Sequence, residues 1–188
     1  MGIALIVVVG IAVVLALMVL GIYNGLVGRR NRIQEAFSTI DVMLKKRYDL
    51  IPNMVATVKQ YMTHESETLT RIAGLRTRAM DPNLPMDERV RVDNELMKGL
   101  RGLMVQVEAY PDLKANENFM HLQRTLNEVE EQLSAARRAF NAAVLDMNNA
   151  VEMFPSNIVA GMFQFKRHEM FEIPEVERVA PDVKSLFA

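Results

Sequence analysis

Residues 3–22 form an uninterrupted apolar run, and this run constrains the possible folds of the chain more than any other feature. Fourteen of its twenty residues are Leu, Ile or Val, and none has a charged, amide or hydroxyl side chain. A helix rises about 1.5 Å per residue, so a run of this length spans about 30 Å, the thickness of the hydrocarbon core of a bilayer. Each Leu, Ile or Val favours insertion by roughly 0.3–0.6 kcal/mol. The run therefore predicts a single transmembrane helix.

A cleaved signal peptide is the main alternative to a permanent anchor. It would need a basic N-terminal region, a shorter apolar stretch and small residues at a cleavage site. Only Met1 and Gly2 precede the run, and the chain continues into Arg29, Arg30 and Arg32 without an Ala-x-Ala step. We therefore expect a retained anchor. Because Lys and Arg near the end of a span stay in the cytoplasm, these arginines predict an external N-terminus and a cytoplasmic remainder.

The composition of the chain limits its partners and its chemistry. The residues after the anchor, 23–188, suffice for one domain with a sizeable core. The formal net charge is −1, so the chain lacks the basic surface that nucleic acid requires, and nucleic acid is not an expected partner. Cysteine is absent, which excludes disulfides, thiolate nucleophiles and cysteine-ligated zinc and agrees with a reducing compartment.

Apolar residues recur with helical spacing throughout the remainder, and no alternating pattern predicts a sheet. The strictest repeat is a heptad seam from Leu122 to Phe154, which Pro155 ends. It predicts one long helix from about Leu113 to Phe154. Packing against its own chain is favoured over an intermolecular coiled coil, because only this segment shows so strict a repeat.

Shorter apolar stripes predict the other helices. The first leaves the membrane and continues to about Leu50; Arg47 interrupts it, and Pro52 should kink or end it, so a chain reversal there stays open. The second covers residues 53–80, and the third runs from a cap at Asp87 to the neighbourhood of Tyr110.

We therefore predict an all-α fold with a single N-terminal transmembrane helix followed by an antiparallel four-helix bundle with long helices. The expected domains are a transmembrane helix at 3–22, a cytoplasmic bundle at 23–171 and a C-terminal tail at 172–188.

The sequence contains no recognisable catalytic or metal-binding motif. His64-Glu65 lacks the second histidine of a zinc-protease helix, and His121 and His168 have no metal-ligand spacing. The glycines never reach the spacing of a phosphate-binding loop. We therefore expect a protein that is not an enzyme and has no cofactor or metal.

Polar residues beside the heptad seam have two interpretations. Asn141 and Asn148 are seven residues apart, so they share a helix face, where they either fix register from buried positions or lie exposed. Glu128, Glu130 and Glu131 are expected on the solvated face of the same helix.

Several long blocks of the sequence resemble the bacterial LemA family. They include Tyr23-Asn24, residues 44–53 (LKKRYDLIPN), residues 108–119 (EAYPDLKANENF) and residues 154–157 (FPSN). The resemblance continues in register from Tyr23 to about Phe171. It implies a membrane anchor followed by a cytoplasmic four-helix bundle, hence a location in the bacterial inner membrane. It supplies no catalytic residues.

Two regions are candidate interaction surfaces. The loop around Tyr110 has more polar side chains than a simple turn needs, and the apolar segment after Pro155 has to be covered by something. Capping of the long helix by Asn116 or Asp112 is the structural alternative for the loop; the bundle, the bilayer and a partner are alternatives for the apolar segment. The candidate residues are Tyr110, Pro111, Asp112, Lys114, Asn116, Glu117, Phe163, Phe165 and Phe171.

The function expected from these features is that of a non-enzymatic, single-pass membrane-anchored interaction or scaffold protein. Its expected partners are the lipid bilayer through residues 3–22, a second copy of itself, and an unidentified membrane or cytoplasmic protein. The alternative is a membrane-tethered ligand-binding sensor or hydrolase with a polar site between bundle helices, lined by Tyr61, His64, Glu65 or Glu108.

Overall fold

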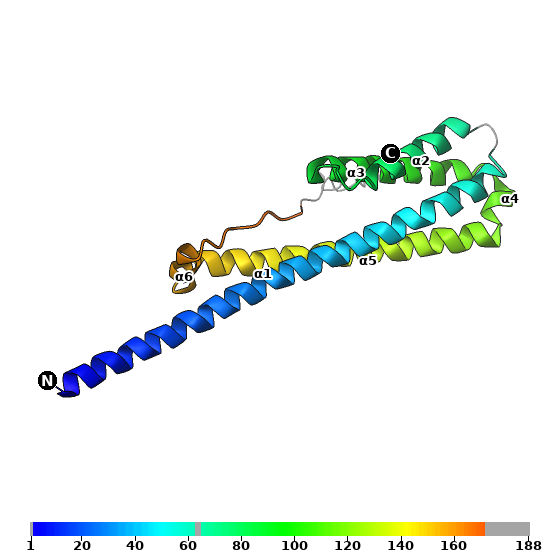
Figure 1. The fold of residues 1–188 in the computed structure, drawn as a ribbon. Helices are drawn as coiled ribbons and strands as arrows, with labels where there is room; N and C mark the ends of the chain where they lie inside the picture. The colour runs from blue at the N-terminus through cyan, green and yellow to red at the C-terminus, as the bar shows by residue number, and fades with distance from the viewer. Residues whose placement is uncertain (1, 63–64, 172–188) are drawn as a thin grey trace, which may run out of the picture. The chain divides into compact units, whose positions relative to one another are not determined.

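A computed structural model describes residues 2–62 and 65–171; the expected C-terminal tail at 172–188 and His64 lie outside this part. The described residues form helices and no strands (Figure 1). The helices are α1 (Gly2–Lys59), α2 (Ser66–Ala79), α3 (Met86–Val107), α4 (Pro111–Lys114), α5 (Glu117–Glu152) and α6 (Ser156–Met162). The prediction of an all-α fold is confirmed.

The chain divides into two compact units. Of the described residues, 2–38 and 136–171 form the first, which we call the anchor unit because it contains the apolar run. Residues 39–135 form the second, which we call the core unit. Helices α1 and α5 each contribute residues to both units.

Helix α1 contains the apolar run and the stripe that follows it, without a break between them. It has 58 residues, and it is the one helix among the described residues that is long and apolar enough to cross a membrane. None of its most apolar window is buried within the structure. These side chains therefore face outward, as the side chains of a lipid-facing span must.

Pro52 neither ends α1 nor reverses the chain, so of the two expected effects, a kink or an end near Leu50, the end is wrong. Proline has no N–H, which leaves the carbonyl four residues earlier, that of Tyr48, without its helical donor. In the structure Nε of Arg76, on α2, donates to this carbonyl at 2.7 Å. A tertiary hydrogen bond thus replaces the missing helical one, and α1 continues to Lys59. The predicted helix at 53–80 is consequently divided between α1 and α2.

The core unit encloses one apolar core built by α1, α2, α3, α4 and α5. Helix α3 begins at Met86, one residue before the predicted cap, and its core members follow the predicted helical stripe, so it presents one apolar face to its neighbours. The short helix α4 adds Leu113, and the start of α5 adds Phe119. The fully buried apolar side chains of this core are those of Ile51, Met54, Val58, Met62, Ile72, Val92, Leu96, Leu100, Leu103, Leu113 and Phe119.

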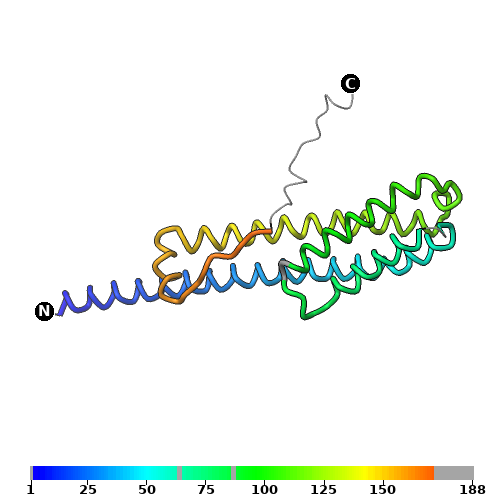
Figure 2. Tube along the Cα trace, turned by 90° about the horizontal axis from the view of Figure 1, so that it is seen from above, coloured from blue at the N-terminus to red at the C-terminus, as the bar shows by residue number. Residues whose placement is uncertain are grey.

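In the anchor unit, two asparagines of α5 hold the extended segment that follows α6 (Figure 2). The Asn148 amide accepts from the His168 backbone N–H at 2.9 Å and donates to the His168 carbonyl at 3.0 Å. Asn141 does the same at Phe171, at 2.8 and 3.0 Å. Seven helical residues rise about 10.5 Å and three extended residues about 10 Å, so the two spacings match. The asparagine repeat therefore binds the chain's own backbone, and we call these two paired contacts, Asn148 with His168 and Asn141 with Phe171, the asparagine brackets.

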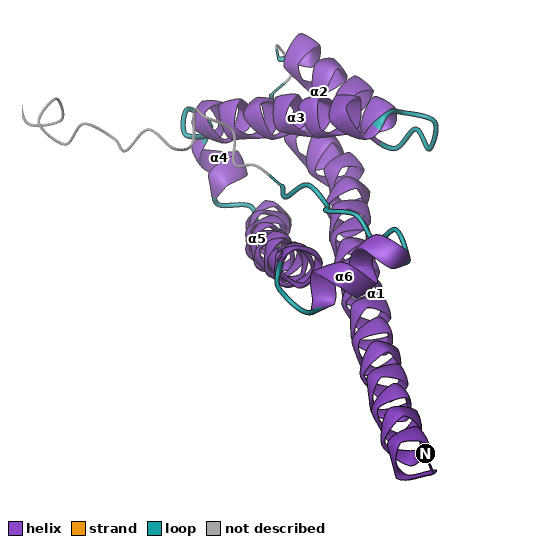
Figure 3. Ribbon diagram, turned by 90° about the vertical axis from the view of Figure 1, so that its left-hand side faces the viewer, coloured by secondary structure: helices purple, strands orange, loops and turns teal. Residues whose placement is uncertain are grey.

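Helix α6 lies beside α1 in the same unit (Figure 3). The ring of Phe163, at the end of α6, is 4.7 Å from that of Tyr23 on α1. The ring of Phe165 is 5.9 Å from the same tyrosine. Helix α6 is therefore attached to α1 at the first residue after the apolar run.

A double-mutant cycle tests the role of Arg76. Arg76→Ala should lower the free energy of unfolding by about 1–3 kcal/mol, because it leaves the Tyr48 carbonyl without a donor. In a Pro52→Ala background the loss should be much smaller, because an alanine at this position restores the helical N–H. Chemical denaturation of the full chain in detergent, followed by circular dichroism, measures both. Equal losses in the two backgrounds would contradict the compensation.

Candidate functional site

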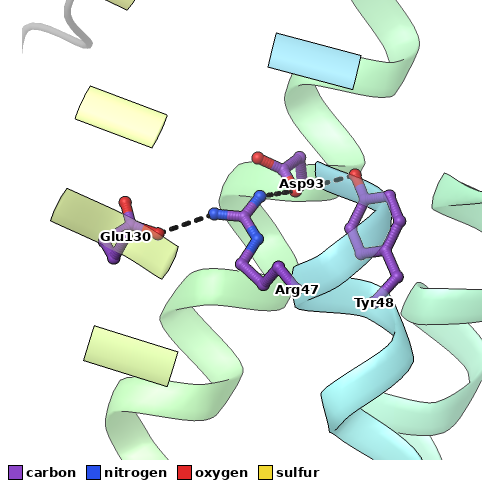
Figure 4. A network of polar contacts seen from close by, with 4 residues as sticks. All are labelled: Arg47, Tyr48, Asp93 and Glu130. Carbon is purple, nitrogen blue, oxygen red and sulfur yellow. Dashed lines mark hydrogen bonds and ion pairs between the residues drawn. The ribbon is translucent and has the colours of Figure 1, made fainter. Parts of the chain in front are cut away.

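The core unit has a charged side chain at its centre. Arg47 interrupts the apolar stripe of α1, and its side chain has no exposure to water. It meets side chains from two other helices, Asp93 on α3 and Glu130 on α5, and lies next to Tyr48 on its own helix (Figure 4). We call these four residues the Arg47 network.

The Arg47 network pairs one guanidinium with two carboxylates. One terminal nitrogen of Arg47 donates to Oδ1 of Asp93, and the other donates to Oε2 of Glu130 at 2.8 Å. The Tyr48 hydroxyl donates to the same oxygen of Asp93 at 2.9 Å. The Asp93 side chain is 6% exposed and that of Glu130 36%, so the network reaches from the interior to the surface.

The surroundings of the network keep Arg47 charged and Tyr48 protonated. Burial alone would lower the pKa of Arg47, but the negative charges of Asp93 and Glu130 outweigh it and raise that pKa above its usual value. Burial raises the pKa of Tyr48 far above its ordinary value of 10, and Asp93 raises it further. Both side chains are therefore hydrogen-bond donors across the physiological range.

The Arg47 network resembles a structural ion-pair network more than a catalytic site. Both terminal nitrogens of Arg47 are directed at carboxylates, and Tyr48 is held as a donor. Within the described residues no group of three or more acidic or histidine side chains could hold a metal ion. A buried charge without its partner is costly, so a placement of α1, α3 and α5 that separated these groups would be unfavourable.

The structure uses several residues of the candidate loop internally. Oδ1 of Asn116 accepts from the Phe119 backbone N–H at 3.0 Å, which confirms the predicted cap at the start of α5. Its Nδ2 donates to the Tyr61 hydroxyl at 3.0 Å. Tyr110 packs against the core.

The remaining loop residues face outward. Lys114 pairs with Glu108, which is also exposed. Pro111 begins α4, and Asp112 and Glu117 are exposed in the first turns of α4 and α5. The loop therefore divides into an internal part and a surface part.

The three candidate phenylalanines contact their own chain in the anchor unit. Phe163 and Phe165 pack on Tyr23, and the Phe171 ring is 4.9 Å from that of Phe140 on α5. Packing on the chain itself accounts for Phe165 and Phe171, which are partly buried, whereas Phe163 stays 50% exposed.

The three arginines that follow the apolar run also join α1 to its surroundings. Arg29 and Arg32 both approach Oδ2 of Asp146 on α5, at 3.2 and 3.6 Å. The Arg30 guanidinium lies 5.8 Å from the centroid of the Phe165 ring. These residues therefore have structural contacts in addition to their expected role in topology.

Sequence reasoning missed the Arg47 network. Its one signal was the charge at Arg47 within an apolar stripe, which required partners on other helices. The expectation that Glu130 belongs to a solvated face is wrong, because its carboxylate is half buried against Arg47. Asp93 gave no signal, since an acidic residue in a helix is ordinarily solvated.

The all-helical architecture, the uncovered apolar helix and the internal polar network define a membrane-associated helical protein. The model of the LemA family matches residues 36–185, most of the chain. The chain belongs to the LemA family.

Curated relatives agree with this assignment. Protein LemA of Metamycoplasma hominis is 29% identical over 168 residues, which cover 87% of this chain and 74% of the relative. Magnetosome protein MamQ 2 of Paramagnetospirillum magneticum is 24% identical, with 80% of this chain and 64% of the relative covered. Magnetosome protein MamQ of Magnetospirillum gryphiswaldense is 22% identical, with 79% and 64% covered. The chain thus spans less than two thirds of the magnetosome proteins it matches.

Removal of one partner tests the Arg47 network. Asp93→Ala should lower the free energy of unfolding by about 3–5 kcal/mol, because it leaves Arg47 buried beside a single, partly exposed carboxylate. Lys45→Ala is the matched control: it removes an exposed ion pair with Asp49 on the same helix and should cost at most about 0.5 kcal/mol. Denaturant unfolding of both variants makes the comparison. Equal, small losses would contradict a structural role.

Proposed function

We propose that this protein is a non-enzymatic scaffold of the bacterial inner membrane, with its N-terminus outside and its helical body in the cytoplasm. The observation that carries the proposal is the uncovered apolar window of α1. Such a surface is strongly unfavourable in water and matches the thickness of a bilayer. In this proposal the body is an antiparallel four-helix bundle held by the Arg47 network.

An interaction role, rather than catalysis, is supported by the way the polar residues are used. The Arg47 network, the Asn116 cap and the two asparagine brackets all bind groups of the same chain. The names of the relatives state no reaction. A partner would therefore bind the outer surface of the helical domain.

The proposed contact surface is the α4 end of the core unit, and its proposed partner is a second copy of the chain. Exposed Pro111, Asp112 and Glu117 lie there. Two exposed apolar side chains flank them in the chain: Val105, 74% exposed at the end of α3, and Met120, 43% exposed at the start of α5. Apolar residues among charged ones are typical of a contact surface.

Photocrosslinking tests self-association. A photoreactive residue at Asp112 should produce a species of twice the mass in native membranes, because this position lies in the proposed contact surface. The same residue at Ala73, exposed on α2, should produce none. Identical patterns at both positions, or only monomers, would overturn self-association through this surface.

A reporter fused after Ala188 tests the orientation. Arg29, Arg30 and Arg32 should keep the reporter in the cytoplasm; replacing all three by Ala and adding lysines after Gly2 should move part of it outside. Asp146→Ala removes the structural partner of two of these arginines and should leave the orientation unchanged. An external reporter on the unaltered protein would refute the proposed orientation.

A further inference from the structure

We propose that the turn between α5 and α6, together with α6 itself, is a second membrane contact that inserts into the headgroup region beside the span. We call this surface the α6 corner. Its apolar side chains are largely uncovered: Met153 is 62% exposed, Phe154 79%, Ile158 56%, Met162 68% and Phe163 50%. The proposal rests on α1 being a membrane span, and the experiment below separates the two claims.

The position of the α6 corner identifies its occupant. Phe163 packs on Tyr23, the first residue after the apolar run, which itself ends at Ile22. If residues 3–22 fill the hydrocarbon core, Tyr23 lies at the interface between lipid and water, and Phe163 lies with it. The corner therefore continues the surface that the span already presents to lipid.

The order of contacts along α5 shows which way the corner faces. Near the end of α5, Asp146 meets Arg29, and further back Phe140 meets Phe37 at 6.1 Å between ring centroids. Moving towards the C-terminus of α5 thus means moving towards the span along α1. The end of α5 and the turn after it are consequently the part of this unit nearest the apolar run (Figure 3).

The α6 corner is held in place before any lipid arrives. The asparagine brackets fix His168 and Phe171 on α5. Gln164 has a φ of 57°, a left-handed conformation that turns the chain so that Phe163 and Phe165 contact the same ring. A preorganised surface binds without the cost of ordering.

Charged residues around the corner suit a lipid surface. Arg30, Lys166 and Arg167 are exposed. Arg167 forms an ion pair with Glu152, with 2.8 Å between the guanidinium nitrogen and the carboxylate oxygen. Cations and a tyrosine beside apolar side chains are typical of segments that lie in the interface. Lys166 and Arg30 are placed to meet lipid phosphates.

The chain contains no tryptophan, so a single introduced tryptophan reports its own depth. The full-length protein would be reconstituted into phosphatidylcholine vesicles with acyl chains brominated either near the headgroup or near the terminal methyl. Three variants are compared: Phe154→Trp in the corner, Leu15→Trp in the middle of the span, and Ala139→Trp, exposed on α5 in the same unit. Ala139 lies about 20 Å back along the helix from the turn.

Bromine near the headgroup should quench the tryptophan at position 154, bromine near the terminal methyl should quench that at position 15, and neither should quench that at position 139. Quenching at 15 without quenching at 154 would overturn the α6 corner and leave the span intact. No quenching at 15 would refute the span. Met162→Trp repeats the measurement within α6 if the first variant fails to fold.

A second copy of the chain is the competing occupant of the corner. It would shift the emission of the tryptophan at 154 to the blue as protein density in the vesicles increases, with no quenching by either lipid. That result would overturn the lipid contact.

Discussion

A guanidinium with no access to water lies among the apolar side chains of the core unit, and the placement of three helices depends on it. Leucines and methionines pack in many alternative ways at similar cost, since dispersion and burial are not directional. Arg47 removes that freedom because its two terminal nitrogens need acceptors from α3 and α5 together. The Tyr48 hydroxyl donates to the same oxygen of Asp93 that Arg47 contacts. The ion pairs are weak evidence of net stability, but a packing that separated Arg47 from its carboxylates would leave a buried charge unpaired.

The need of buried polar groups for hydrogen-bond partners also explains why Arg47, Tyr48 and Pro52 occur together in one short stretch of α1. Arg47 and Tyr48 belong to the network through their side chains, and five residues after Arg47 comes Pro52, whose missing N–H frees the carbonyl of Tyr48. Arg76 fills that vacancy from α2. One short stretch of α1 therefore binds α2, α3 and α5, by side chains towards two of them and by its backbone towards the third.

In the anchor unit, too, backbone groups are satisfied by side chains from distant residues. At Asn141 and Asn148 each side-chain amide both donates to and accepts from the backbone of one residue of the extended segment, as a neighbouring strand does in a sheet. This contact is independent of the side chains of that segment, so it fixes the path of the chain and leaves the apolar residues of α6 free to face outward. A membrane-anchored protein uses such residues beside its span, where the surroundings are no longer purely aqueous.

Sequence periodicity alone determined the helical class, the apolar span and the approximate extent of α3 and α5, because these follow from local spacing, length and breakers. Capping by Asn116 was also legible, since a cap acts within a few residues. Three features could not be predicted from the sequence: the continuation of α1 through Pro52, the burial of Glu130 against Arg47, and the asparagine brackets. Each depends on a partner 20 or more residues away, and a one-dimensional pattern does not reveal which distant group will supply a missing hydrogen bond. Only the tertiary structure decided those pairings.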